Sequence, residues 1–258
     1  MKLTADDILG TSSWAVETRH RVAQIARHRY SVLITGPPGS GKRFLATVLH
    51  ALSPRAAKPL VPVDCSRLGE QSFASQLFGH EEEAFAGLSG AALGSFRAAD
   101  SGSLFLGQVE RLPLEFQPLL LDALKSGHVR PLGAKRPVNV DVRLICSSLC
   151  DLQKEIQQRR LIPELYAQLD AVSLPTIPLR ERVEDIAALS QHFLEVVAED
   201  YGDAPRKLGE GALKRLKQYR WPGNIGELRS ALERAAVLAG GDVLVAADFD
   251  FLGGERPV

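Results

Sequence analysis

The chain has 258 residues, of which 45% are hydrophobic and 24% are charged, and its 31 basic residues balance its 31 acidic ones. This composition is ordinary for a globular protein with one large domain, or with one domain and a smaller one attached. The zero net charge argues against a chain built throughout to clamp nucleic acid, so no direct nucleic-acid binding is predicted.

The sparse cysteines and the missing apolar spans exclude further classes. Cys65, Cys146 and Cys150 have neither the number nor the spacing of a disulfide framework or a zinc site, and no metal site is predicted. No apolar stretch reaches membrane-spanning length, and the N-terminus lacks a signal-peptide pattern. The sequence therefore predicts a protein of the reducing cytoplasm, without membrane contact.

Short apolar runs alternate with helical periodicity along the first two thirds of the chain. Strands are predicted at 31–35, 60–64, 104–106, 140–146 and 171–174, and helices are clearest over 44–52 and 116–124. Pro62 indicates that the second strand lies at a sheet edge, because proline cannot donate a hydrogen bond to a neighbouring strand. The alternation predicts an α/β protein with a parallel sheet covered on both faces.

The pattern changes after Pro175. Helices are predicted over 186–199, 212–219 and 225–238, and one weak strand over 243–245. We therefore expect an α/β domain over residues 1–178 and a small helical domain over residues 179–258.

A glycine-rich turn follows the first predicted strand and opens a helix. It reads Gly36-Pro37-Pro38-Gly39-Ser40-Gly41-Lys42 and fits the pattern GxxxxGK. Glycines let several backbone N–H groups converge on one anion, the start of the helix adds its positive dipole end, and Lys42 adds a charge. This phosphate loop predicts binding of a nucleoside triphosphate or diphosphate, with ATP or ADP as the expected cofactor. The alternative is a strand-to-helix turn that merely contains glycines.

Arg43 follows the phosphate-loop lysine. Many such loops have a serine or threonine there, whose hydroxyl holds Mg²⁺. Arginine cannot ligate a metal, so Mg²⁺ binding is expected to be weak or absent. The predicted cofactor-binding segment is 36–43.

Five further strings accompany the phosphate loop in a fixed order. They are ILGTS at 8–12, LFGHE at 77–81, FRAADSGSLFL at 96–106, PLRERVEDI at 178–186 and WPGN at 221–224. With these strings the chain resembles the central ATPase domain of the bacterial sigma-54-dependent transcription activators, which belong to the AAA+ superfamily. The resemblance covers nearly the whole chain. It implies a three-layer α/β/α fold with a C-terminal helical lid, and a ring that hydrolyses ATP to remodel polymerase bound to the sigma factor.

The resemblance also shows which catalytic groups this sequence lacks. Gly107 and Gln108 stand for an Asp-Glu pair, Ile162 and Gln168 for two finger arginines, Gly226 for a sensor arginine, Ser148 and Leu149 for a polar sensor pair, and Asp64 for a restraining asparagine. A missing general base costs about 10² to 10⁴ in rate, and a missing arginine finger about 10³ to 10⁵. The sequence therefore predicts a pseudo-ATPase that binds nucleotide, barely hydrolyses it, and acts as a regulatory protein-interaction module in transcription control.

Two alternatives remain open at this point. Asp100 and Glu110 flank the third predicted strand and could be relocated acids of an active AAA+ ATPase that remodels a protein partner. A third interpretation is a scaffold whose nucleotide pocket is vestigial and empty.

The family contacts its sigma factor through a loop that reads GAFTGA. The aligned segment is 83–88, where Phe85 and Gly87 remain and the threonine is replaced by Ala86. An exposed aromatic side chain can anchor a protein partner, although Phe85 packed on its own domain is an equal alternative. The expected partner is a related AAA+ subunit or the transcription machinery, and oligomerisation is possible. Whether the chain is complete, or a fragment without sensory and DNA-binding domains, stays open.

Overall fold

The computed structural model describes residues 3–66, 70–82 and 90–253. Its internal contacts divide the chain into two units, each of which is described by itself. Unit 1 comprises Met1–Ala5, Arg21–Gly36 and Lys42–Pro175. Unit 2 comprises Asp6–His20, Pro37–Gly41 and Thr176–Val258. The middle of the phosphate loop therefore groups with the C-terminal helices.

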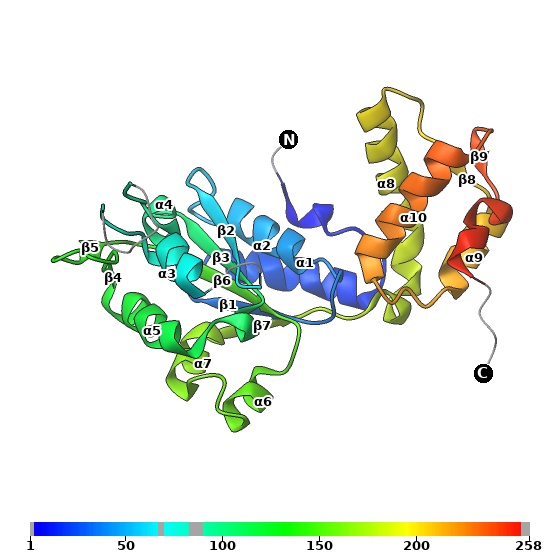
Figure 1. The fold of residues 1–258 in the computed structure, drawn as a ribbon. Helices are drawn as coiled ribbons and strands as arrows, with labels where there is room; N and C mark the ends of the chain where they lie inside the picture. The colour runs from blue at the N-terminus through cyan, green and yellow to red at the C-terminus, as the bar shows by residue number, and fades with distance from the viewer. Residues whose placement is uncertain (1–2, 67–69, 83–89, 254–258) are drawn as a thin grey trace. The chain divides into compact units, whose positions relative to one another are not determined.

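Within the described residues, unit 1 is built on a five-stranded sheet of order β2-β3-β6-β1-β7 (Figure 1). Its strands are β1 (Val32–Thr35), β2 (Leu60–Asp64), β3 (Ser103–Gly107), β6 (Arg143–Ser148) and β7 (Val172–Pro175). All neighbouring strands are parallel, so their carboxyl ends meet at one edge of the sheet. β2 lies at the outer side of the sheet, which confirms the prediction made from Pro62.

The strand predicted at 140–146 begins later in the structure and ends later. β6 starts at Arg143, and the residues before it that do pair, 138–139, belong to a small antiparallel pair instead. This pair consists of β4 (His128–Val129) and β5 (Val138–Asn139), and the Val140 N–H then donates to Gly127 O. The alternating valines Val140 and Val142 suggested that the strand begins at residue 140, but the hydrogen bonds of the sheet begin only at Arg143.

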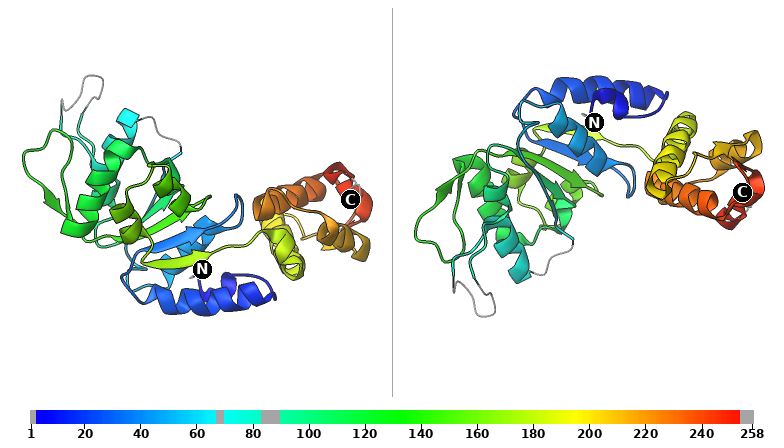
Figure 2. Two further views of the ribbon diagram at one scale, coloured as in Figure 1. Left: turned by 90° about the horizontal axis from the view of Figure 1, so that it is seen from below. Right: turned by 90° about the horizontal axis from the view of Figure 1, so that it is seen from above.

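Helices cover both faces of the sheet, as predicted (Figure 2). The α-helices that lie wholly within the described part of unit 1 are α2 (Lys42–Ala51), α3 (Glu70–Phe78), α4 (Ser95–Ala98), α5 (Gln117–Ser126), α6 (Leu152–Gln157) and α7 (Pro163–Leu169). Fully buried side chains such as Phe73, Leu104 and Leu144 form the core on one face. The helices predicted at 44–52 and 116–124 are confirmed as α2 and α5.

Unit 2 packs three longer helices around a second apolar core. They are α8 (Ile186–Tyr201), α9 (Glu210–Gln218) and α10 (Asn224–Leu238), as predicted, with a short parallel pair of β8 (Lys207–Leu208) and β9 (Val243–Leu244). Trp221, Leu228 and Phe249 are completely buried there. Helix α1 (Ser13–Ala26) starts in unit 2 and ends in unit 1. None of the described helices is long and apolar enough to cross a membrane.

Candidate functional site

The phosphate loop is fixed by hydrogen bonds to its carbonyl groups. Within unit 2, three successive carbonyls accept: Pro38 O from Asn224 Nδ2 at 2.8 Å, Gly39 O from the Ile225 N–H at 3.0 Å, and Ser40 O from Arg182 Nη2 at 3.0 Å. The Ser40 hydroxyl also lies 2.7 Å from the Thr176 hydroxyl. All these partners come from the C-terminal segment that begins at Thr176.

The held carbonyls decide where the loop's N–H groups point. In a trans peptide unit, the carbonyl oxygen and the N–H of the next residue point in opposite directions. The N–H groups of Gly39, Ser40 and Gly41 are therefore directed away from the C-terminal helices, although the Ser40 N–H also makes a long turn bond to Pro37 O at 3.4 Å. Successive N–H groups on one side of a loop form a concave binding site for an anion.

The loop approaches the start of α10 so closely that one of its glycines is required. Gly39 has φ +69°, and a Cβ there would lie 2.1 Å from Gly223 O. On the other side of this contact, Asn224 also adopts a left-handed conformation, with φ 55°. Its side chain is buried and bonds in both directions, since Oδ1 accepts from the Leu179 N–H at 2.8 Å while Nδ2 holds Pro38. WPGN is thus the part of the sequence that holds the loop.

The string PLRERVEDI holds the N-terminal segment in the same unit. Asp185 is fully buried, and its carboxylate accepts from the Thr11 and Ser12 N–H groups and the Ser12 hydroxyl, each at 2.8 Å. Gly10 is required beside it, because a Cβ there would lie 2.2 Å from Asp185 Oδ1. Arg182, which bonds the loop, stacks 4.0 Å over the Trp14 ring. Burial lowers the pKa of Arg182 to about 10, while Asp185 acts to raise it.

In unit 1, Lys42 interacts electrostatically with the carboxylate of Glu110. Its ammonium donates to Gly36 O at 2.8 Å, and the Gly36 N–H donates to Ser148 O at 3.2 Å. The next residue along, Leu149, donates its N–H to Glu110 Oε1 at 3.2 Å. Glu110 Oε2 is buried, and within the described residues it has no hydrogen-bond partner. Burial lowers the pKa of Lys42 from 10.5 to about 8, although Glu110 acts to raise it.

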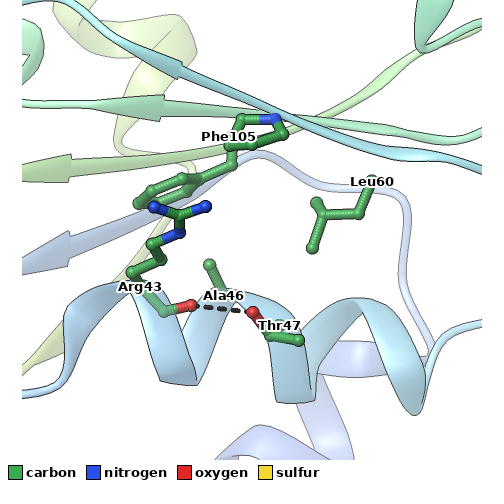
Figure 3. Close-up of a pocket in the computed structure, with 6 residues that line it drawn as sticks. Arg43, Ala46, Thr47, Leu60 and Phe105 are labelled. Atoms are coloured by element: carbon green, nitrogen blue, oxygen red, sulfur yellow. Dashed lines mark hydrogen bonds between the residues drawn. The ribbon is translucent and has the colours of Figure 1, made fainter.

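Arg43 faces a small cavity in unit 1, and its guanidinium lies beside the Phe105 ring (Figure 3). The cavity has a volume of about 110 Å³ and is lined by Arg43, Ala46, Thr47, Leu60, Pro62 and Phe105. The Thr47 hydroxyl donates to Arg43 O at 3.1 Å. Arg43 therefore belongs to the surface between α2 and the outer strands.

At the end of β3, where the family has its acidic pair, the side-chain amide of Gln108 is hydrogen-bonded to the Asp64 carboxylate. Gln108 Nε2 donates to Asp64 Oδ1 at 3.2 Å and to Ser66 Oγ at 3.0 Å. Asp64 Oδ1 also accepts from the Ser66 N–H at 3.0 Å and the Ser66 hydroxyl at 2.6 Å. A larger residue would fit at Gly107, because a Cβ there would make only ordinary van der Waals contacts, the nearest at 3.6 Å to Val63 O.

The other positions where the sequence departs from the family are spread over both units. Ile162 caps the start of α7 and packs against the core of unit 1, and Gln168 lies in α7. The Ser148 hydroxyl donates to Cys150 O at 2.8 Å. In unit 2, a Cβ at Gly226 would lie 3.9 Å from the Gly39 Cα, so this position adjoins the loop and has space for a side chain.

Asp100 is at the wrong end of the sheet to serve as a relocated acid. It precedes β3, and its Oδ1 accepts from the Asp141 N–H, which precedes β6. Both residues therefore lie at the amino ends of parallel strands, whereas the phosphate loop follows the carboxyl end of β1. Glu110, which follows β3, is on the side of the loop.

Phe85 and Gly87, the expected partner-contacting residues, lie outside the described residues. The base of their segment is described. His80 Nε2 lies 2.9 Å from Gly90 O, and its Nδ1 lies 2.7 Å from the Ser75 hydroxyl. Among the described residues, no group of three or more His, Cys, Asp or Glu residues could hold a metal ion.

The sheet order, the GxxxxGK loop after β1 and the helical C-terminal segment define a P-loop domain of the AAA+ type. The sigma-54 interaction domain family matches residues 8–175, and the AAA+ ATPase lid domain family matches residues 180–252. The chain belongs to the sigma-54 interaction domain family, and it is an AAA+ domain of the sigma-54 activator type found in transcription regulators.

Known relatives match the chain over nearly all of its length. The response regulator PilR of Pseudomonas aeruginosa is 38% identical over 93% of this chain and 54% of its own. The transcriptional regulator NtrC of Bradyrhizobium is 37% identical over 94% of this chain and 50% of its own. The chain thus spans about half the length of these curated relatives.

Solved structures agree with the fold. The crystal structure of Brucella abortus NtrX in complex with ADP is 31% identical, covers 97% of this chain and 57% of its own, and has a TM-score of 0.88. The complex of the same protein with ATP has a TM-score of 0.87, also at 31% identity, over 97% of this chain and 56% of its own.

Proposed function

We propose that this chain binds ATP or ADP through residues 36–43, hydrolyses it very slowly, and works as a regulatory protein-interaction module in transcription control. Residues 1–178 form the nucleotide-binding domain and residues 179–258 form its lid. The partner is a related AAA+ subunit or a component of the transcription machinery. Mg²⁺ contributes weakly or not at all, because Arg43 and Gly107 occupy the positions where a hydroxyl and an acid would hold it.

The observation that carries the binding proposal is the geometry of the loop. Three held carbonyls direct successive N–H groups to one side, and Lys42 adds a positive charge within the same motif. The ADP and ATP complexes of Brucella abortus NtrX, at 31% identity, support the assignment of an adenine nucleotide. The proposal of slow hydrolysis is supported by the uncharged residues Gly107, Gln108, Ile162, Gln168 and Gly226.

A paired assay on one preparation tests both halves of the proposal. We expect calorimetry to show binding of ADP and ATP with dissociation constants on the order of micromolar, equivalent to about −8 kcal/mol. Phosphate release from ATP should proceed far below the 1 to 10³ s⁻¹ of ordinary enzymes. A folded preparation that takes up neither nucleotide would refute the binding proposal and favour the interpretation of a scaffold whose nucleotide pocket is vestigial.

The pH dependence of ADP affinity should show the loss of the proton from Lys42. Its pKa of about 8 lies below the ordinary value, so the free protein loses this proton above pH 8. Bound phosphate retains the protonated form, because the two charges attract. Affinity should therefore be constant below pH 8 and fall by about tenfold per pH unit above it, since one proton separates the two states. Calorimetry from pH 7 to pH 9.5 measures this, and Lys42→Met should give a flat profile. An affinity that is constant to pH 9.5 in the unaltered chain would contradict the assignment.

The second candidate is an active ATPase that remodels a protein partner with a relocated acid. Only Glu110 still supports it, because its buried Oε2 has no hydrogen-bond partner among the described residues and its charge acts on the pKa of Lys42. Turnover at ordinary enzyme rates in the paired assay would favour this candidate over the first.

A further inference from the structure

We propose that the cavity beside Arg43 is a binding site for a small carboxylate, an organic acid with a short aliphatic tail. All the residues that line this cavity belong to unit 1, where it lies between α2 and the outer strands β2 and β3 (Figure 3). The site would give the chain a second ligand besides the nucleotide, and it does not depend on the function proposed above.

The walls of the cavity follow from the periodicity of one helix and two strands. Ala46 and Thr47 lie three and four residues after Arg43 in α2, which places these three residues on one face of the helix. Pro62 of β2 and Phe105 of β3 are partners in the sheet register, so their side chains share the face of the sheet that meets α2. Ala46 and Phe105 are buried, and Arg43 and Pro62 are exposed. The cavity therefore has an apolar interior and a charged residue at its rim.

Arg43 supplies the only charged side chain in the lining of the cavity. Its guanidinium lies beside the Phe105 ring, and within the described part of the chain it makes no hydrogen bond or ion pair (Figure 3). Its five N–H donors form a rigid planar fork, and a carboxylate accepts two of them side by side. The Thr47 hydroxyl gives its proton to Arg43 O, so the guanidinium is the side-chain donor that the cavity offers to a ligand.

This lining favours a carboxylate over a phosphate. A carboxylate can turn both of its oxygens towards the guanidinium and place its aliphatic tail against Ala46 and Phe105. A phosphate has oxygens on all sides, and those that face the apolar side chains would be buried without a donor. Burying an unsatisfied acceptor is costly, more so when it is charged. One guanidinium above an apolar interior is therefore matched by an acid with an apolar body.

The volume of the cavity limits the length of the tail. A dry cavity of about 150 Å³ can hold a benzene molecule. The cavity beside Arg43 has a volume of about 110 Å³. It should therefore accommodate an acid of about four carbons, such as butyrate. Each methylene group that is buried there should tighten binding about fourfold, because apolar burial is favourable by about 0.8 kcal/mol per methylene.

The Arg43 side chain is directed differently from that of Lys42. Consecutive residues of an α-helix point about 100° apart, so their side chains do not face one another. The Lys42 ammonium donates to Gly36 O and interacts with Glu110, whereas Arg43 faces β2 and β3. Arg43 thus ends the proposed nucleotide-binding segment 36–43 with its backbone and lines a separate cavity with its side chain.

Titration of the full chain with sodium butyrate at neutral pH and constant ionic strength tests the inference, with the amide NMR signals of Ala46 and Thr47 as reporters. We expect a dissociation constant on the order of millimolar, as for other very small ligands. Propionate should bind about fourfold more weakly than butyrate. 1-Butanol, which has the same tail without the charge, should bind at least tenfold more weakly. Hexanoate is too long for the cavity and should bind no more tightly than butyrate.

Two variants separate the contribution of the guanidinium from that of the cavity. Arg43→Met removes the donors and should weaken butyrate binding at least tenfold. Thr47→Leu fills the cavity and should also weaken butyrate binding at least tenfold. Its ADP dissociation constant should stay within twofold, because Thr47 lies outside the segment 36–43. Arg29→Met is the control, at an exposed arginine of unit 1, and should change neither affinity more than twofold.

The contrary results are distinct from one another. Reporter signals that stay constant throughout the titration would overturn the inference. Equal butyrate affinities of the original chain and Arg43→Met would show that the guanidinium makes no contact, and full affinity in Thr47→Leu would place the ligand outside the cavity. Inorganic phosphate that binds more tightly than butyrate would indicate a general anion site. A chain that binds butyrate as expected but takes up no ADP would support this inference and refute only the proposed function.

Discussion

Replacing Trp221 with alanine should lower the free energy of unfolding of unit 2 by about 3–5 kcal/mol, the usual cost of truncating a buried aromatic residue. Trp221 is completely buried, its indole N–H donates to Leu216 O at 2.8 Å, and the Tyr219 ring meets its edge at a centroid distance of 5.0 Å. Alanine would lose these contacts and still hold the left-handed φ of 50°.

The chain supplies its own reporter for this measurement. Its two tryptophans, Trp14 and Trp221, both belong to unit 2, so tryptophan fluorescence during urea unfolding follows that unit. Trp14 remains as the reporter in the variant. Tyr201→Ala is the matched control, because this aromatic side chain of the same unit is 60% exposed and should cost less than about 0.5 kcal/mol. Equal effects of the two substitutions would contradict the role of Trp221 in the core.

Replacing Lys42 with methionine should weaken ADP binding about 10- to 150-fold, which corresponds to the 1.5–3 kcal/mol of a hydrogen bond to a charged group. Methionine keeps most of the length of the side chain and removes the charge. Residues 38–40 should keep their shape, because their carbonyls bond to residues other than Lys42, whereas the bond from Lys42 to Gly36 O is lost. The loss should therefore appear as a lower affinity in calorimetry, with an unchanged circular dichroism spectrum.

Lys125→Ala is the control for charge alone. Lys125 is an exposed lysine near the end of α5, and its removal should leave the ADP dissociation constant within twofold. If Lys42→Met binds ADP as tightly as the original chain, phosphate contact by this lysine is excluded.

Local patterns were sufficient to predict most elements of the fold. Apolar runs and turn residues identified the five strands of the sheet, and Pro62 placed β2 at its side. Strands β4, β5 and β8 have only two residues each, too few for any periodicity to show. The predicted start of β6, at residue 140, was wrong, because alternating valines resemble a strand whether or not a neighbouring strand pairs with them.

The site was harder to predict, because its contacts join residues far apart in the sequence. Asp64 and Gln108 are 44 residues apart, and Asn224 and Pro38 are 186 apart. No short-range pattern shows such pairs. The position of Asp100 could have been predicted from the sequence. Asp100 precedes a parallel strand and the phosphate loop follows one, so the two lie at opposite ends of the sheet.

The attachment of residues 37–41 to the C-terminal segment has a practical consequence for the design of shortened versions of this protein. Cutting the chain at Pro175 would keep all five strands of the unit 1 sheet. It would also remove four residues that bond to the phosphate loop: Thr176, Arg182, Asn224 and Ile225. The glycine-rich segment would then have lost every one of these restraints. Such a fragment would be a misleading reagent for ligand screening, and a weak result from it would say little about the intact molecule.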